Sequence, residues 1–185
     1  VELHCHSSFS FLDGASSPLE LATAAAELGY PALGLVDHDG IWGSMEFAVS
    51  CKGAGVRPIT GTELTVSAVG RLFHLTLLVE DEAGYRNLCR LLTEAHAHTR
   101  DGQGRQAGQP SLPLESLAGY AEGLVCLSGC ARQGLVASAW AEGDLARGTG
   151  FARRLLGFFG PDNFRIELQR PFWRHDRARN RWLSE

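Results

Sequence analysis

The 185-residue sequence lacks several patterns that mark common protein classes. It has no apolar run long enough for a membrane helix and no signal-peptide layout, which predicts a cytoplasmic protein with no membrane partner. Neither a G-x-G-x-x-G fingerprint nor a Walker A phosphate loop is present. The formal net charge is −4, so no global basic field draws the chain to nucleic acid.

Cysteine and basic residues add little to this picture. Five cysteines are an odd number, and their spacing matches no zinc finger or disulfide framework, which favours reduced thiols in the cytoplasm. Nine arginines lie between residues 147 and 181, and a solvated helix face explains them more simply than a binding patch. The apolar fraction of 44% and the charged fraction of 21% are ordinary for a globular domain with a real core.

The first thirteen residues, VELHCHSSFSFLD, hold the most informative pattern. His4 and His6 are two apart on a short apolar strand, so both imidazoles point to one face. With the nearby carboxylate of Asp13 they form the start of a metal site suited to zinc, manganese or iron. An isolated His-x-His pair is about as often two ordinary histidines on a half-exposed strand. The hypothesis therefore depends on the rest of the chain.

Hydrophobic periodicity predicts alternating strands and helices. Strands are expected at 3–6, 32–36, 56–63, 73–79, 124–127 and 164–168, and helices at 18–28, 44–54, 82–98, 133–141, 145–158 and 177–185. Ser17, Pro18 and Glu20 form a capping box at the first helix, and residues 100–110 are expected to be an exposed loop. This order predicts a parallel sheet with helices outside it.

Two parallel arrangements compete, an open doubly wound sheet and a closed barrel. Polar residues recur at or just after successive strands, namely His4, His6, His38, Glu63 and Cys130, while His74 sits on a strand rather than after it. In a barrel the carboxyl ends of all strands meet at one mouth, whereas in an open sheet they spread along an edge. The placement of the polar residues therefore favours the barrel.

Together these side chains form one candidate metal cluster of nitrogen, oxygen and sulfur donors: His4, His6, Asp13, His38, Glu63, His74 and Cys130. Such clusters hydrolyse phosphate esters by activating water and clamping the leaving oxygen, and carboxylates can bridge two ions. Glu63 and Asp13 are therefore the candidate catalytic carboxylates. Each member also has a plain alternative, since His74 could be a core histidine, Cys130 a small buried hydrophobe and Asp13 a turn residue.

Six segments in series resemble the PHP (polymerase and histidinol phosphatase) domain: HCHSSFSFLDGAS, LVDHDGIWG, PITGTEL, HLTLLVEDEAGYRNLCRLL, GLVCLSGC and FRIELQR. They are most similar to the PHP domain at the N-terminus of bacterial family C DNA polymerase alpha subunits. The stretch HLTLLVEDEAGYRNLCRLLTEAHAHTR and the ending PFWRHDRARNRWL are most similar to the error-prone, damage-associated branch. The resemblance covers essentially the whole chain, so residues 1–185 are expected to be one PHP domain.

The resemblance implies an α/β fold, a distorted (β/α)7 barrel, with a site for up to three divalent ions such as zinc, manganese or iron. The implied ligands are His4, His6, Asp13, His38, Glu63, His74 and Cys130. The family pattern ends with an Asp-x-His pair on a last strand, whereas this chain stops at Glu185, and a barrel usually needs about 250 residues. We therefore expect a fragment that lacks the last barrel strand and the magnesium-dependent polymerase domains.

Three functions remain open at this level. The first is a metal-dependent phosphoesterase domain of an error-prone DNA polymerase, acting as a 3′→5′ exonuclease in replication and damage repair. Its partners would be primer–template DNA, through the full-length polymerase, and other replication or repair proteins. The second is a free-standing phosphatase of the histidinol-phosphatase kind. The third is a structural PHP domain that has lost its chemistry. Because every matched ligand position holds a donor, the first is favoured.

Overall fold

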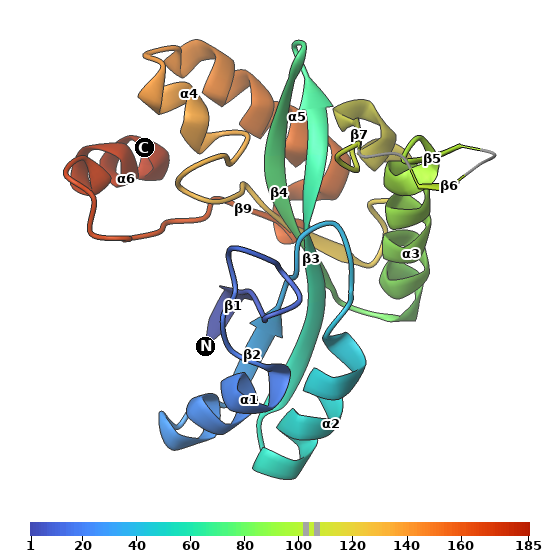
Figure 1. Ribbon diagram of the computed structural model, residues 1–185. Helices are drawn as coiled ribbons and strands as arrows, with labels where there is room; N and C mark the ends of the chain where they lie inside the picture. Colours follow the sequence, from blue (N-terminus) through green and yellow to red (C-terminus); the bar gives the residue numbers. More distant parts are fainter. Residues whose placement is uncertain (102–103, 106–107) are drawn as a thin grey trace.

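A curved seven-stranded sheet runs through the computed structural model, which describes residues 1–101, 104–105 and 108–185 (Figure 1). The strand order is β1-β2-β3-β4-β8-β9, and β7 pairs separately with β3. The strands are β1 (Glu2–Cys5), β2 (Ala32–Leu35), β3 (Arg57–Ala68), β4 (Arg71–Val79), β7 (Leu112–Pro113), β8 (Leu124–Leu127) and β9 (Phe164–Arg165). In this order β1 and β9 stand at the two ends, so the pairings give an open, curled sheet.

Helices flank the sheet and alternate with its strands (Figure 1). They are α1 (Pro18–Glu27), α2 (Ser44–Ala54), α3 (Glu82–Ala97), α4 (Ala137–Ala141), α5 (Leu145–Asn163), α6 (Asp176–Ser184) and the 3-10 helix η1 (Leu114–Gly119). The predicted capping box of α1 is confirmed, because Ser17 Oγ accepts from Glu20 N and Glu20 Oε2 accepts from Ser17 N. No helix in the described part of the chain is both long and apolar enough to cross a membrane.

The prediction of a parallel sheet is only partly right. β1, β2 and β3 are parallel, as are β8 and β9, but β4 runs antiparallel to both of its neighbours. The reason is a tight hairpin between β3 and β4, in which Val69 and Gly70 both have positive φ angles, 46° and 73°. Two left-handed residues match the twist of the strands they join. The hairpin lengthens both strands beyond their predicted bounds and projects from the sheet (Figure 1).

Several predicted bounds also differ from the structure. The strand expected at 164–168 pairs only at Phe164–Arg165, and the chain then continues without pairing to α6. The helix expected at 133–141 begins at Ala137. Within the expected loop at 100–110, β5 (Arg100–Asp101) pairs with β6 (Gly104–Arg105), and residues 102–103 and 106–107 lie outside the described residues.

Two main apolar clusters hold these layers together. The larger one packs β3, β4 and β8 against α3, η1 and α5, with Leu64, Phe73, Leu75 and Leu124 fully or almost fully buried. The smaller one packs β2 against α1 and α2 around Phe47. The larger cluster therefore covers the β3–β4–β8 part of the sheet, and the smaller one covers β2.

We expect Gly61→Ala to destabilise the protein by about 1–3 kcal/mol, the usual cost of overpacking a core. Gly61 lies on β3 opposite Leu78, and an added Cβ would overlap the backbone oxygen of Leu77 and come within 2.9 Å of Val36. Urea unfolding measures the change. Gly53→Ala in α2 is the control, because its Cβ would meet no atom within 4 Å. It should stabilise by about 0.5–1 kcal/mol, and equal losses in both variants would contradict this packing.

Candidate metal centre

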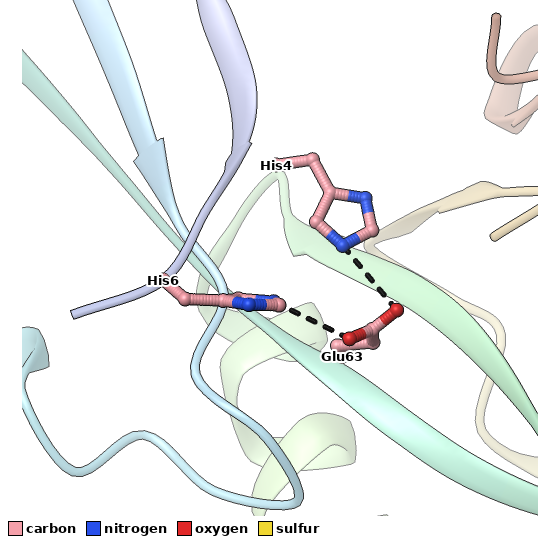
Figure 2. Close-up of side chains that lie close together, drawn as sticks. All are labelled: His4, His6 and Glu63. Atoms are coloured by element: carbon pink, nitrogen blue, oxygen red, sulfur yellow. Dashed lines mark ion pairs between the residues drawn. The ribbon is translucent and has the colours of Figure 1, made fainter. Parts of the chain in front are cut away.

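The buried carboxylate of Glu63 lies at the centre of the candidate site, and its side chain is only 2% exposed. His4 Nε2 lies 3.3 Å and His74 Nδ1 3.4 Å from Oε1 of Glu63. His6 Nε2 lies 3.3 Å and His38 Nδ1 3.1 Å from Oε2. Figure 2 shows His4 and His6 approaching different oxygens of this carboxylate. Four imidazoles thus share one anion.

These side chains come from β1 and its end, from the loop after β2, and from β3 and β4. His4 lies on β1 and His6 just after it, with the same orientation because they are two residues apart. His38 follows β2, where it forms an isolated parallel bridge with Glu63 of β3. His74 lies near the start of β4. Because β4 is antiparallel to β3, its start lies at the same end of the sheet as the ends of β1 and β2.

Asp13 joins the cluster from the loop after β1. Its Oδ2 accepts a hydrogen bond from His6 Nδ1 at 2.6 Å and lies 3.1 Å from His38 Nε2. The loop itself is held by Asp37, a buried residue that the sequence analysis did not assign. The Asp37 carboxylate accepts hydrogen bonds from Ser7 N, Ser7 Oγ and Ser10 Oγ at 2.8–2.9 Å. Asp37 therefore fixes the position of Asp13 through the backbone.

Cys130 is the one predicted ligand that stands slightly apart. It lines the same pocket, and its Sγ accepts a hydrogen bond from Gln133 N at 3.3 Å. Within the described residues, three groups have ligand atoms within 4.8 Å of one another, and Cys130 belongs to none of them. The groups are His4–His6–Glu63, His6–Asp13–His38 and His38–Glu63–His74. The roles of all seven residues as ligands stay predictions.

The mutual proximity of these groups shifts their acid–base equilibria. Burial alone would lower the pKa of His4, but the neighbouring carboxylates of Glu167 and Glu63 raise it to about 10. Burial alone would also lower the pKa of His74, but the neighbouring Cys130 and Glu63 side chains favour its charged form and raise the pKa to about 10. For Glu63 burial is outweighed by its histidine partners, which hold its pKa well below the usual range.

The donor set fits a divalent metal ion. His6 Nε2 and Glu63 Oε1 are buried and make no hydrogen bond within the described protein, although each faces a group of opposite character. Buried polar atoms normally have a partner, and a cation placed among these atoms would supply one. Imidazole nitrogen with carboxylate oxygen is a donor set that first-row divalent metals favour. Glu63, which offers two oxygens to two imidazoles each, is placed to serve more than one ion.

Two further site residues were missed by the sequence analysis. Glu167 Oε1 lies 2.6 Å from His4 Nδ1, and Gln169 Nε2 donates to the same carboxylate oxygen at 2.6 Å. The signal was present in FRIELQR, where apolar and polar residues alternate, so that Glu167 and Gln169 share the face opposite Ile166. That alternation predicts the face but not the partner, because His4 is 163 residues away.

The cluster lies in a pocket of about 450 Å³ whose other wall is largely apolar. Phe11 and Leu12 come from the loop after β1, and Pro171 and Trp173 come from the segment before α6. Arg132 adds the one basic side chain of this wall, with its guanidinium 5.7 Å from the ring centre of Trp173. The pocket thus combines a polar floor with aromatic and cationic edges.

Comparison with known proteins agrees with this picture. The family model of the PHP domain matches residues 2–171. The chain is 40% identical to an error-prone DNA polymerase of Symbiobacterium thermophilum and 39% identical to one of Mycobacterium tuberculosis, over 100% and 91% of its length. It is also 37% identical to the DNA polymerase III subunit alpha of Treponema pallidum, over 91% of its length. The chain spans only 15–18% of the length of these relatives.

One solved structure shares the fold. It is a Bifidobacterium adolescentis protein assigned to the metal-dependent phosphoesterases, with a TM-score of 0.55 over 89% of this chain and 84% of that one. The sequence identity is 16%, so this likeness concerns the fold alone. Together with the family match it confirms the predicted fold class, an α/β fold of the PHP barrel type, here with a curled but open sheet.

We expect the ion-free protein to lose stability as the pH rises from 6.5 towards about 8, which stays below the pKa of about 8.5 of a free thiol. The pKa values of His4 and His74 rise on folding from 6.5 to about 10. Their contribution is therefore complete below pH 6.5 and is lost as the pH approaches the folded values. Urea unfolding with a chelator present measures this. Glu63→Gln should flatten the profile, and a parent profile that is flat or rises would contradict the assignment.

Proposed function

Because the chain belongs to the PHP domain family, we propose that it is a metal-dependent phosphoesterase domain that removes nucleotides from the 3′ end of DNA within an error-prone DNA polymerase. The observation that carries the chemistry is the convergence of four imidazoles on the buried carboxylate of Glu63. Such a donor set is costly to assemble without a cation, because it buries an anion with hydrogen-bonding capacity left over.

The proposed ligands are the seven residues predicted from the sequence: His4, His6, Asp13, His38, Glu63, His74 and Cys130. They would hold up to three ions of zinc, manganese or iron, which when bound lower the pKa of water and neutralise charge on a phosphate. Glu63 would bridge ions through its two oxygens, and Asp13 would hold His6 and His38 in place from the pocket side. Cys130 would join through movement of the short loop that Gln133 N now holds.

The wall of the pocket supports a nucleotide as the substrate. Phe11 is 86% exposed and Trp173 is 45% exposed beside the cluster, and Arg132 stacks on Trp173. Exposed aromatic rings next to a phosphate-cleaving site suit stacking on nucleobases, while arginine suits the phosphate backbone. Leu12 and Phe172, on the two loops that form this wall, hold positive φ angles of 68° and 63°. Such strain is retained where a fixed loop shape matters.

Proposals for the longer protein follow from its relatives. For the longer protein we propose the polymerase reaction with its magnesium ions, a primer–template partner and contacts with replication or repair proteins, because relatives of which this chain spans only 15–18% are named as DNA polymerases. A cytoplasmic location is proposed with them, in keeping with the five free cysteines.

The two alternatives fit less well. A free-standing phosphatase would resemble small phosphatases in sequence, whereas the relatives reported above are polymerases. A purely structural domain has no need to keep four histidines around one buried carboxylate, which costs desolvation. Retained donors therefore favour the catalytic reading over the structural one.

Glu63→Gln should abolish hydrolysis while the protein stays folded. The amide keeps the shape but loses the charge that the four imidazoles face, so the change removes the proposed bridge between ions. The assay uses single-stranded DNA labelled at its 5′ end, with manganese or zinc added, and follows shortening from the 3′ end. Glu94→Gln is the control, because Glu94 lies on α3 and contacts Ser116 away from the pocket. Equal rates for Glu63→Gln and the parent protein would refute the role.

Trp173→Ala should lower kcat/KM for DNA about tenfold or more, since base stacking on an aromatic ring is worth about 1–3 kcal/mol per base. Hydrolysis of bis(p-nitrophenyl) phosphate should change little, because this diester carries no base. Tyr85→Ala is the control, as Tyr85 is 44% exposed but lies outside this pocket. If both substrates lose activity to the same degree in Trp173→Ala, the ring supports the pocket and does not recognise the base.

A further inference from the structure

The two histidines of the His-x-His pair have the same hydrogen-bond pattern. In each, Nε2 lies 3.3 Å from an oxygen of Glu63, and Nδ1 lies 2.6 Å from a second carboxylate. For His6 the second carboxylate is Asp13, one of the predicted ligands. For His4 it is Glu167, which is neither one of the predicted ligands nor a member of the three ligand groups. In both imidazoles, therefore, a carboxylate holds Nδ1 while Nε2 points towards Glu63.

We propose that Glu167, supported by Gln169, is a positioning residue that orients His4 for metal binding from the far side of the open sheet. The proposal rests on the metal site proposed above. A carboxylate that accepts the Nδ1–H of a histidine fixes the tautomer with Nε2 free, fixes the ring plane and makes the free nitrogen a better donor. Glu167 is suited to this task because its side chain is only 9% exposed.

Gln169 connects this carboxylate to the rest of the pocket. Its Nε2 donates to Glu167 Oε1 at 2.6 Å, and its Oε1 accepts from Ala131 N, beside Cys130, at 2.8 Å. One amide thus links the support of His4 to the loop that carries the predicted sulfur ligand. Thr76 Oγ1, from β4, lies 3.0 Å from His4 Nδ1 and closes the same network.

The segment that carries both residues is itself held in place. Glu167 N donates to Ser128 Oγ at 2.9 Å, at the end of β8. The carbonyl oxygen of Gln169 accepts from Arg179 Nη2 at 2.7 Å and from Asn180 Nδ2 at 2.9 Å, both on α6. Because residues 166–175 form no strand, these side-chain bonds do the work that sheet pairing does elsewhere. A rigid second layer of this kind is what holds a site to the geometry it needs.

The test is the zinc affinity of the protein, measured by competition with a chromophoric chelator. Glu167→Gln should bind zinc about 10- to 100-fold more weakly, the usual effect of losing such a partner. Glu94→Gln is the matched control and should bind as the parent does. In a His4→Ala background, Glu167→Gln should have no further effect, because the residue acts through His4. Unchanged affinity in the single variant, or additive losses in the double variant, would overturn the proposal.

A second readout does not depend on metal. The His4 Nδ1–H proton should give a low-field NMR signal in the ion-free parent and lose it in Glu167→Gln, and a signal that persists would overturn the proposal. If the parent bound no zinc at all, the proposed metal site would fail while this signal still decided the positioning. Should Glu167→Gln not fold, Gln169→Ala replaces it, since it removes one donor to the carboxylate and the contact with residue 131. It should weaken zinc binding, and unchanged affinity would overturn the proposal.

Discussion

The contact between Glu63 and its four imidazoles determines most of the architecture around it. A carboxylate that is almost fully buried on the central strand must be neutralised by groups that reach it from several directions. β1, the loop after β2, and β4 each supply one or two of them. This constraint explains why β2 and β3 are joined at the site by backbone contacts as well, with Glu63 N donating to the carbonyl oxygens of Val36 and Asp37.

The antiparallel course of β4 meets the same constraint with a different topology. A further parallel strand would have offered its carboxyl end to the site, after a crossover connection of a dozen residues or more. A two-residue turn at Val69 and Gly70 instead returns the chain directly, in a register that sets Thr76 opposite Glu63 and His74 opposite Thr65. Thr76 and His74 thereby reach the site from one face of the strand, two residues apart. The hairpin therefore supplies a metal-binding candidate and a supporting hydroxyl with few residues.

The sequence predicted contacts between residues close together in the chain better than contacts between residues far apart in it. The common orientation of His4 and His6 follows from the two-residue period of a strand, and the structure places both Nε2 atoms 3.3 Å from Glu63. The helix cap at Ser17 is equally local. The hairpin was missed because Val69 is an unusual residue for a left-handed turn, so only Gly70 signalled it. Glu167 was missed because its partner lies at the opposite end of the chain, and no periodicity carries that information.

The ion-free arrangement also shows what metal binding has to overcome. The carboxylates that raise the pKa values of His4, His6 and His74 favour imidazolium, yet a metal ion needs the neutral ring. If these residues held a metal ion, it would therefore replace protons in neutralising Glu63. Asp13 and Glu167 can orient their histidines with or without a metal ion. Each accepts the Nδ1–H of its histidine, and this hydrogen bond does not depend on whether Nε2 carries a proton or a metal ion. Asp13 and Glu167 would thus hold the His-x-His pair in one orientation both with protons and with a metal ion at its centre.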